Sequence, residues 1–147
     1  IVLAGVNAYQ ALIVSDGIFS GLYEGESALG IQGCRDVAVT DLDIFGPAGD
    51  AYDIGVYQAG PGITPVTAER ITVDGGTVTR VGRTGLGITS SVDTVAVRGI
   101  TWLDVARSIV DMELTSDIWD ITDFTFQDNI ALTVNLGFIA GSGLGFG

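Results

Sequence analysis

Four aspartates at the ends of short apolar stretches are the residues of this sequence best placed to do chemistry: Asp16, Asp41, Asp43 and Asp74. Two carboxylates on either side of a glycosidic bond can hydrolyse it, one as the acid and the other as base or nucleophile. Several carboxylates that converge on one point can instead bind Ca²⁺, which prefers hard oxygen ligands. The cluster therefore predicts either catalytic aspartates or a calcium site made by Asp41, Asp43 and Asp74. The structural alternative is that these residues cap turns and keep the surface soluble.

Arg98 is the basic residue that could join this chemistry, because it stands near Asp120 and Asp123 and aligns with Asp74. The six basic residues of the chain are all arginines, and histidine and lysine are absent. This composition excludes a Ser-His-Asp triad, a histidine-based zinc site and a lysine base. Carboxylates and arginine are the tools that remain. The structural alternative is a surface ion pair between Arg98 and Asp74 or Asp123, which contributes about 0 to 1 kcal/mol.

Two tyrosines predict a binding surface. Tyr52 and Tyr57 flank a short apolar segment that leads into residues 59–68, which carry two of the three prolines and form an expected inserted loop. Exposed aromatic rings beside carboxylates are a common way to hold sugar rings. We therefore predict that Tyr52 and Tyr57 bind carbohydrate, with a role in covering the base of the loop as the alternative.

The elements that position these residues recur along the chain. Stretches of similar pattern that begin at Val37, Ile71, Val95 and Trp119 align in register, and the interval from Ile71 to Val95 equals that from Val95 to Trp119. A weaker copy begins at Ile13, at the same interval before Val37, and the longer interval from Val37 to Ile71 contains the expected loop. A fixed period in the twenties indicates stacked supersecondary units.

Each copy reads as about three short strands separated by corners, so that stacked copies would form three stacks of strands. Apolar residues alternate within the copies, as in half-buried strands, and Asp or Gly stands where the alternation changes phase: Asp41, Gly75, Gly99 and Asp123. Asp and Gly tolerate the left-handed backbone that a corner needs. We expect an all-β solenoid of about five rungs of about 24 residues, with equivalent strands about 4.8 Å apart. Asp16 and Asp74 then share a column about 9.6 Å apart, near the upper carboxylate separation of inverting glycosidases.

Residues 28–44 and 86–102 carry a resemblance to a known family. Both join a short Gly-Ile strand to a Val-Ala-Val strand through a polar turn, and in this they resemble the repeat of pectate-lyase-like proteins. The resemblance covers roughly residues 11–136 and implies a right-handed parallel β-helix, and we expect residues 1–147 to form a single domain of this kind. It also implies a possible arginine base, Arg98, beside carboxylates such as Asp74 and Asp123. The Asn-Thr-Asp, Asp-Asp, Gly-His and Arg-Ile-Lys motifs of polygalacturonase-like members are absent.

Composition limits the partners. The net charge is −12 and the pI is near 4.1, which argues against nucleic acid. No stretch reaches the ~18 apolar residues that a membrane-spanning helix needs, so membrane insertion is not expected. The single cysteine, Cys34, excludes an internal disulfide and fits a small core residue. Residues 137–147 form a Gly-rich apolar tail, from which we expect a segment of a longer chain or a subunit with buried ends, most simply a homotrimer.

Two hypotheses of function follow. In the first, the chain is a structural and carbohydrate-facing segment of a viral tail fibre, tailspike or similar appendage, located outside the cell or on the virion, with a cell-surface polysaccharide as partner. In the second, it is the core of a secreted polysaccharide lyase or glycoside hydrolase that uses the outward aspartates, with or without Ca²⁺. The same kind of fold serves both classes.

Overall fold

The computed structural model describes residues 2–8, 12–15, 18–20, 27–56, 64–113, 120–134 and 137–142. Regular structure in these residues is β throughout. The strands are β1 (Val2–Ala8), β2 (Leu12–Ser15), β3 (Ile18–Ser20), β4 (Leu29–Thr40), β5 (Asp43–Phe45), β6 (Tyr52–Gly55), β7 (Ala68–Asp74), β8 (Thr77–Val81), β9 (Thr84–Ile88), β10 (Val92–Arg98), β11 (Thr101–Val105), β12 (Ser108–Glu113), β13 (Ile121–Gln127), β14 (Ile130–Val134) and β15 (Gly137–Ser142). The predicted residues Asp16, Tyr57 and Trp119 lie outside the described part of the chain.

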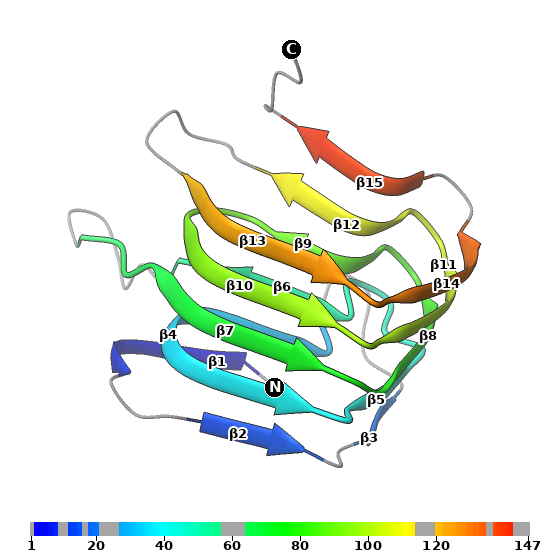
Figure 1. The fold of residues 1–147 in the computed structure, drawn as a ribbon, viewed down its shortest axis with the longest axis horizontal. Helices are drawn as coiled ribbons and strands as arrows, with labels where there is room; N and C mark the ends of the chain where they lie inside the picture. Colours follow the sequence, from blue (N-terminus) through cyan, green and yellow to red (C-terminus); the bar gives the residue numbers. More distant parts are fainter. Residues whose placement is uncertain are drawn as a thin grey trace.

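The strands form two parallel sheets (Figure 1). The larger has ten strands in the order β13-β10-β7-β4-β6-β9-β12-β15, with β1 and β2 both paired to β4. The smaller has five strands in the order β14-β11-β8-β5-β3. Parallel strands cannot be joined by a tight hairpin. Strands that pair, such as β4 and β7, are therefore not consecutive in the sequence. In the described part of the chain, no helix has the length and apolarity to cross a bilayer.

The prediction of a right-handed parallel β-helix with about five rungs of about 24 residues is wrong. A three-strand rung requires three separate stacks of strands, but the structure has two sheets. The physical reason lies in β4, whose twelve residues run without interruption through two of the expected stacks and join them. Gly33 and Asp36, with φ of 60° and 55°, bend β4 while its neighbours stay hydrogen-bonded.

The predicted period of about 24 residues is confirmed from β7, β8 and β9 to β10, β11 and β12, but it fails at the step from β10 to β13. Val37 pairs with Ile71, Ile71 with Val95, and Val95 with Phe124, so the spacing along the chain differs at each of these three steps. The sequence alignment placed Trp119 opposite Val95, where the structure has Phe124. The apolar residues that face the core determine this register, and the connections between strands absorb the differences in length.

Residues with left-handed backbone stack at three corners. Across the sheets they form three columns, listed in strand order: Asp36, Arg70, Thr94 and Asp123; Asp41, Gly75, Gly99 and Asp128; and Gly46, Arg80 and Asp104. The predicted corners at Asp41, Gly75 and Gly99 are confirmed by φ between 50° and 75°. Asp123 also has a positive φ, but it belongs to a different column from the predicted one, because β13 is shifted in register.

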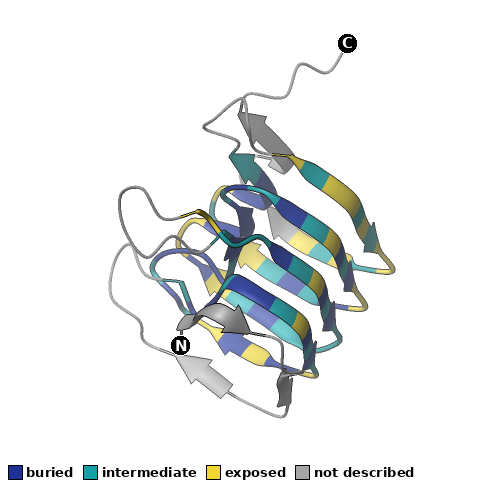
Figure 2. Ribbon diagram, turned by 90° about the vertical axis from the view of Figure 1, so that its left-hand side faces the viewer, coloured by how far each residue is buried: buried dark blue, intermediate teal, exposed yellow. Residues whose placement is uncertain are grey.

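The core is made of apolar columns that run across the strands. Val37, Ile71 and Val95 are all at most 3 % exposed, and Trp102 is fully buried. Figure 2 shows buried and exposed positions alternating along the strands of the large sheet. Cys34, 5 % exposed, is part of this core, as expected from the sequence, and burial raises the pKa of its thiol.

Parts of the expected inserted loop and of the expected Gly-rich tail belong to strands. Ala68, the last residue of the expected inserted loop, is the buried first residue of β7. Residues 137–142 of the expected Gly-rich tail form β15, which pairs with β12.

Candidate functional site

Of the aspartates expected to do chemistry, Asp41 follows β4, Asp43 begins β5 and Asp74 ends β7, and their catalytic role stays a prediction. Asp43 Oδ1 accepts a hydrogen bond from the Thr77 amide at 2.9 Å, and Asp74 Oδ2 accepts one from Arg98 Nε at 2.9 Å. Asp41 is exposed and donates its backbone N–H to the Asp74 carbonyl at 2.9 Å. No group of three His, Cys, Asp or Glu side chains in the described residues is arranged to hold a metal ion. The calcium site of Asp41, Asp43 and Asp74 stays a prediction.

Arg98 forms the surface ion pair with Asp74 that the sequence offered as its structural alternative. Both side chains are well exposed, 46 % for Arg98 and 40 % for Asp74. The expected grouping of Arg98 with Asp123 is wrong, because the residue of β13 that pairs in register with Arg98 is Gln127. The Nε hydrogen of Arg98 is donated to Asp74, and the role of Arg98 as a base stays a prediction.

Tyr52 is not on the surface. Its side chain is fully buried, and its ring meets that of Trp102 edge-on, with 6.2 Å between the centroids. Burial raises the pKa of the Tyr52 hydroxyl well above its usual value. The prediction that Tyr52 stacks on a sugar is therefore wrong, because the ring belongs to the core. The strand alternation of 52–55 places Tyr52 inward with Ile54, a signal that sequence reasoning overlooked.

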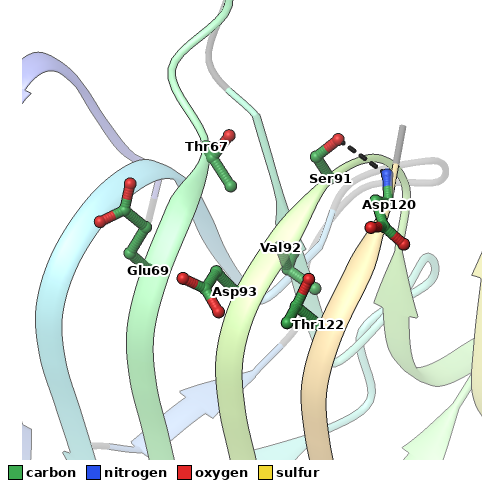
Figure 3. A pocket seen from close by; sticks show the side chains of 7 residues that line it. All are labelled: Thr67, Glu69, Ser91, Val92, Asp93, Asp120 and Thr122. Carbon is green, nitrogen blue, oxygen red and sulfur yellow. Dashed lines mark hydrogen bonds between the residues drawn. The ribbon is translucent and has the colours of Figure 1, made fainter. Parts of the chain in front are cut away.

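A pocket of about 310 Å³ opens on the outer face of the large sheet, where β7, β10 and β13 begin (Figure 3). Six of the seven residues that line it carry a carboxylate or a hydroxyl. The lining residues are Thr67, Glu69, Ser91, Val92, Asp93, Asp120 and Thr122. Asp120 was considered in the sequence only as a neighbour of Arg98, and the other six were missed. The available signal was the acidic residue that recurs two positions before the apolar residues Ile71 and Val95.

Strand pairing aligns the pocket's polar groups in a row. Asp93 pairs in register with Glu69 on one side and with Thr122 on the other, and neighbouring strands lie about 4.8 Å apart. The Ser91 hydroxyl accepts a hydrogen bond from the Asp120 amide at 3.0 Å, which connects the starts of β10 and β13 (Figure 3). The pocket floor is therefore built on three paired strands of the sheet.

The acidic side chains of the pocket differ in whether an arginine compensates their charge. Arg35 Nη2 lies 2.8 Å from Glu69 Oε1, and Arg70 Nη1 lies 3.3 Å from Glu69 Oε2, so the charge of Glu69 is compensated. Asp93 accepts a hydrogen bond from its neighbour Thr94 at 3.0 Å. Asp93 and Asp120 make no ion pair with the described arginines. The pocket consequently offers hydrogen-bond acceptors and hydroxyls, and it repels anions.

A second polar cluster lies on the other limb of the large sheet. Asp53 on β6 and Asp111 on β12 occupy the same register column, with Gly87 between them. Burial raises the pKa of the Asp53 carboxyl, although Gln32 and Thr89 each donate a hydrogen bond to it at 3.2 Å. Burial therefore favours the protonated form of Asp53, since it penalises the charged form.

Asp111 and Glu113 extend this cluster along β12. Asp111 is 3 % exposed, and its Oδ2 atom has no hydrogen-bond partner among the described residues. Arg107 Nη2 lies 3.6 Å from this oxygen, which makes a loose ion pair. Burial, followed by the charge of Asp111 and a hydrogen bond to it, raises the pKa of Glu113. The pocket does not extend to this cluster, and we assign the cluster to the framework of the large sheet.

Comparison with known proteins leaves the family open: no family model, no curated protein and no solved structure matches this chain.

Proposed function

We propose that this protein is a structural component of a surface appendage and that its pocket binds neutral carbohydrate. The observation that carries the proposal is the row Glu69, Asp93 and Thr122 on three adjacent strands, with further hydroxyls at the rim. Sugar hydroxyls donate to carboxylates and exchange hydrogen bonds with Ser and Thr side chains. A rigid sheet holds these acceptors at a fixed spacing, which lowers the entropy lost on binding.

The arginines support a neutral ligand over an acidic one. Five of the six form ion pairs within the protein, and Arg80 lies over the ring of Phe45 at 5.3 Å. An acidic polysaccharide needs cationic side chains directed toward it. The net charge of −12 would also repel such a polymer. The more specific expectation of a viral tail fibre or tailspike stays a prediction.

The experiment is a binding screen of the intact chain against neutral and acidic oligosaccharides, followed by calorimetry on any ligand found. Asp93→Asn keeps the shape of the side chain and removes its charge. Because a hydrogen bond to a charged group contributes about 1.5 to 3 kcal/mol, the variant should lose at least about tenfold in affinity.

The matched control is Asp104→Asn. Asp104 is exposed on the small sheet with a φ of 56°, and Asn also tolerates this backbone. The control should bind as the unaltered protein does. Binding confined to acidic glycans, or equal affinity in both variants, would contradict the proposal.

A glycoside hydrolase is the second candidate, and the register pair Glu69–Asp93 favours it. Strands about 4.8 Å apart bring two carboxylates near the separation of about 5 to 5.5 Å that retaining enzymes use. The same oligosaccharides should then be cleaved with retention of configuration, and Asp93→Asn should abolish product formation. Binding without any release of reducing ends after prolonged incubation would leave the structural role alone.

A further inference from the structure

Both ends of the molecule present open strand edges. In the described part of the chain, β13, β14 and β15 each pair on one side only, with β10, β11 and β12. At the opposite end, β1 and β2 pair only with β4, and β3 only with β5. Unpaired N–H and C=O groups on an edge favour pairing with another strand. Each end therefore has three parallel edges, with the same strand direction at both.

The end formed by β13 and β14 carries exposed and half-buried apolar side chains beside the polar residues of β13. Ile130 and Leu132 on β14 are 57 % and 53 % exposed, and they are two of the three exposed large hydrophobic residues in the described chain. Phe124 and Phe126 on β13 pack only partly against the core. Apolar surface of this kind favours an interface over contact with water.

The register columns show what fits this end. Leu12 pairs with Val37, and the same column continues through Ile71 and Val95 to Phe124. A second copy placed on the end would bring its β2 against β13, with Leu12 at the register position opposite Phe124 and Val14 at the position opposite Phe126. Apolar residues would then occupy both sides of the continued column, as they do within one copy.

The small sheet continues in the same way. Phe19 begins a column that runs through Ile44, Val78 and Trp102 to Ala131. A second copy would set its Phe19 at the position opposite Ala131, so that a large residue is matched to a small one. Its Ile18 would fall opposite the exposed Ile130, and strand pairing there would remove apolar area of Ile130 from water.

The remaining edge matches β15 to β1. The column that starts at Val2 passes through Gly30, Asp53, Gly87 and Asp111 and ends at Ala140. In the continued registers of all three edges, no paired position of either copy is charged. The charge of −12 on each copy still repels at long range, so association should be stronger at high salt.

We propose that copies of this chain associate head to tail, with β13, β14 and β15 of one copy paired to β2, β3 and β1 of the next. The interface joins two different surfaces, so it does not close on itself and generates an open linear assembly. It uses the strand edges, whereas the carbohydrate pocket lies on the outer face of the sheet, so the two proposals can fail separately.

The test is sedimentation of the intact chain at increasing protein concentration in 0.15 M and 0.5 M NaCl. The expected result is a size that grows continuously with concentration and is larger at the higher salt. A monomer at every concentration would overturn the proposal and indicate that something other than a second copy covers the end. A closed trimer would overturn it as well.

The end formed by β13, β14 and β15 is tested by the double substitution Ile130→Lys and Leu132→Lys. Both side chains are exposed, so folding should be retained, as circular dichroism would show, while assembly is lost. The matched control places the same two charges in the same register columns on β8, at Thr77→Lys and Thr79→Lys, and should assemble normally.

Mixing the variant with the unaltered protein tests the two ends of the molecule separately. The Ile130/Leu132 variant keeps an intact β1–β3 end, so a small fraction of it added to the unaltered protein should shorten the assemblies by capping them. Unchanged assembly of the variant alone, or no shortening in the mixture, would overturn the proposed pairing.

Discussion

Asp50 and Arg83 form a two-point ion pair at the junction between the small and the large sheet, with Nε to Oδ1 at 2.8 Å and Nη2 to Oδ2 at 2.7 Å. The carboxylate is 3 % exposed and also accepts the Thr84 amide at 3.0 Å, whereas the guanidinium is 44 % exposed. The pair therefore anchors a buried carboxylate from the solvent side, which connects the loop before β6 to the start of β9.

Asp50→Ala should lower the free energy of unfolding by about 3 kcal/mol, because it removes a charge-assisted pair and leaves a buried amide without its acceptor. Urea denaturation measures this loss. The control is Asp74→Ala, which breaks an exposed pair and should cost less than about 1 kcal/mol. Equal losses in the two variants would show that the burial of Asp50 has no energetic consequence.

Asp53 should make the protein less stable as the pH rises. Burial raises its pKa above the usual 3.8, so the unfolded chain loses this proton before the folded chain does. The free energy of unfolding then falls as the pH rises from about 4 through the raised pKa, and it is unaffected by this group below that window. Asp53→Asn cannot ionise, so it should gain stability over the unaltered protein across the same window, measured by denaturation at a series of pH values.

Asp36 provides the control of opposite sign. Its hydrogen bond with Arg70 lowers the pKa of this exposed carboxyl. Its contribution is present above the usual pKa and is lost as the pH falls through the lowered one. The stability difference between Asp36→Asn and the unaltered protein should therefore shrink toward acid. If both variants showed the same trend with pH, these assignments would be refuted.

Gly76→Ala should be far more disruptive than Gly46→Ala, although both glycines have positive φ, 86° and 69°. A Cβ on Gly76 would press on the backbone of Leu42, 2.7 Å from its nitrogen, whereas a Cβ on Gly46 would meet no atom within 4 Å. We expect a loss of about 1 to 2 kcal/mol at Gly46 from backbone strain alone. At Gly76 the loss should be about 2 kcal/mol larger, because two strands must separate. Thermal unfolding of the two variants measures the difference.

The local features of the strands could be read from the sequence, but their arrangement could not. Apolar alternation places Val37, Ile71 and Val95 in one column, and Asp or Gly marks corners correctly, because both signals depend on a few neighbouring residues. Whether β4 breaks between two stacks depends on hydrogen bonds to β6 and β7, which are remote in sequence. The register of β13 depends in the same way on its pairing with β10, which the sequence does not show.

The candidate site was harder to predict for a related reason. The sequence groups the aspartates at the corners as a cluster, but it does not show that Asp43 and Asp74 accept hydrogen bonds from Thr77 and Arg98. Glu69 and Asp93 become neighbours only through strand pairing, so their proximity is invisible until the register is known. Tyr52 shows the reverse error, since an aromatic residue next to a loop proved to be part of the core.

The connections that lead into the pocket differ widely in length. The connection from β6 to β7 covers 56–67, that from β9 to β10 covers 89–91, and that from β12 to β13 covers 114–120. Thr67, Ser91 and Asp120 are the last residues of these three connections, and all three line the pocket. Insertions and deletions at this junction leave the strand ladder intact while they reshape the rim. Evolution, or a protein engineer, can therefore diversify ligand recognition here by changing loop length, without having to redesign the fold.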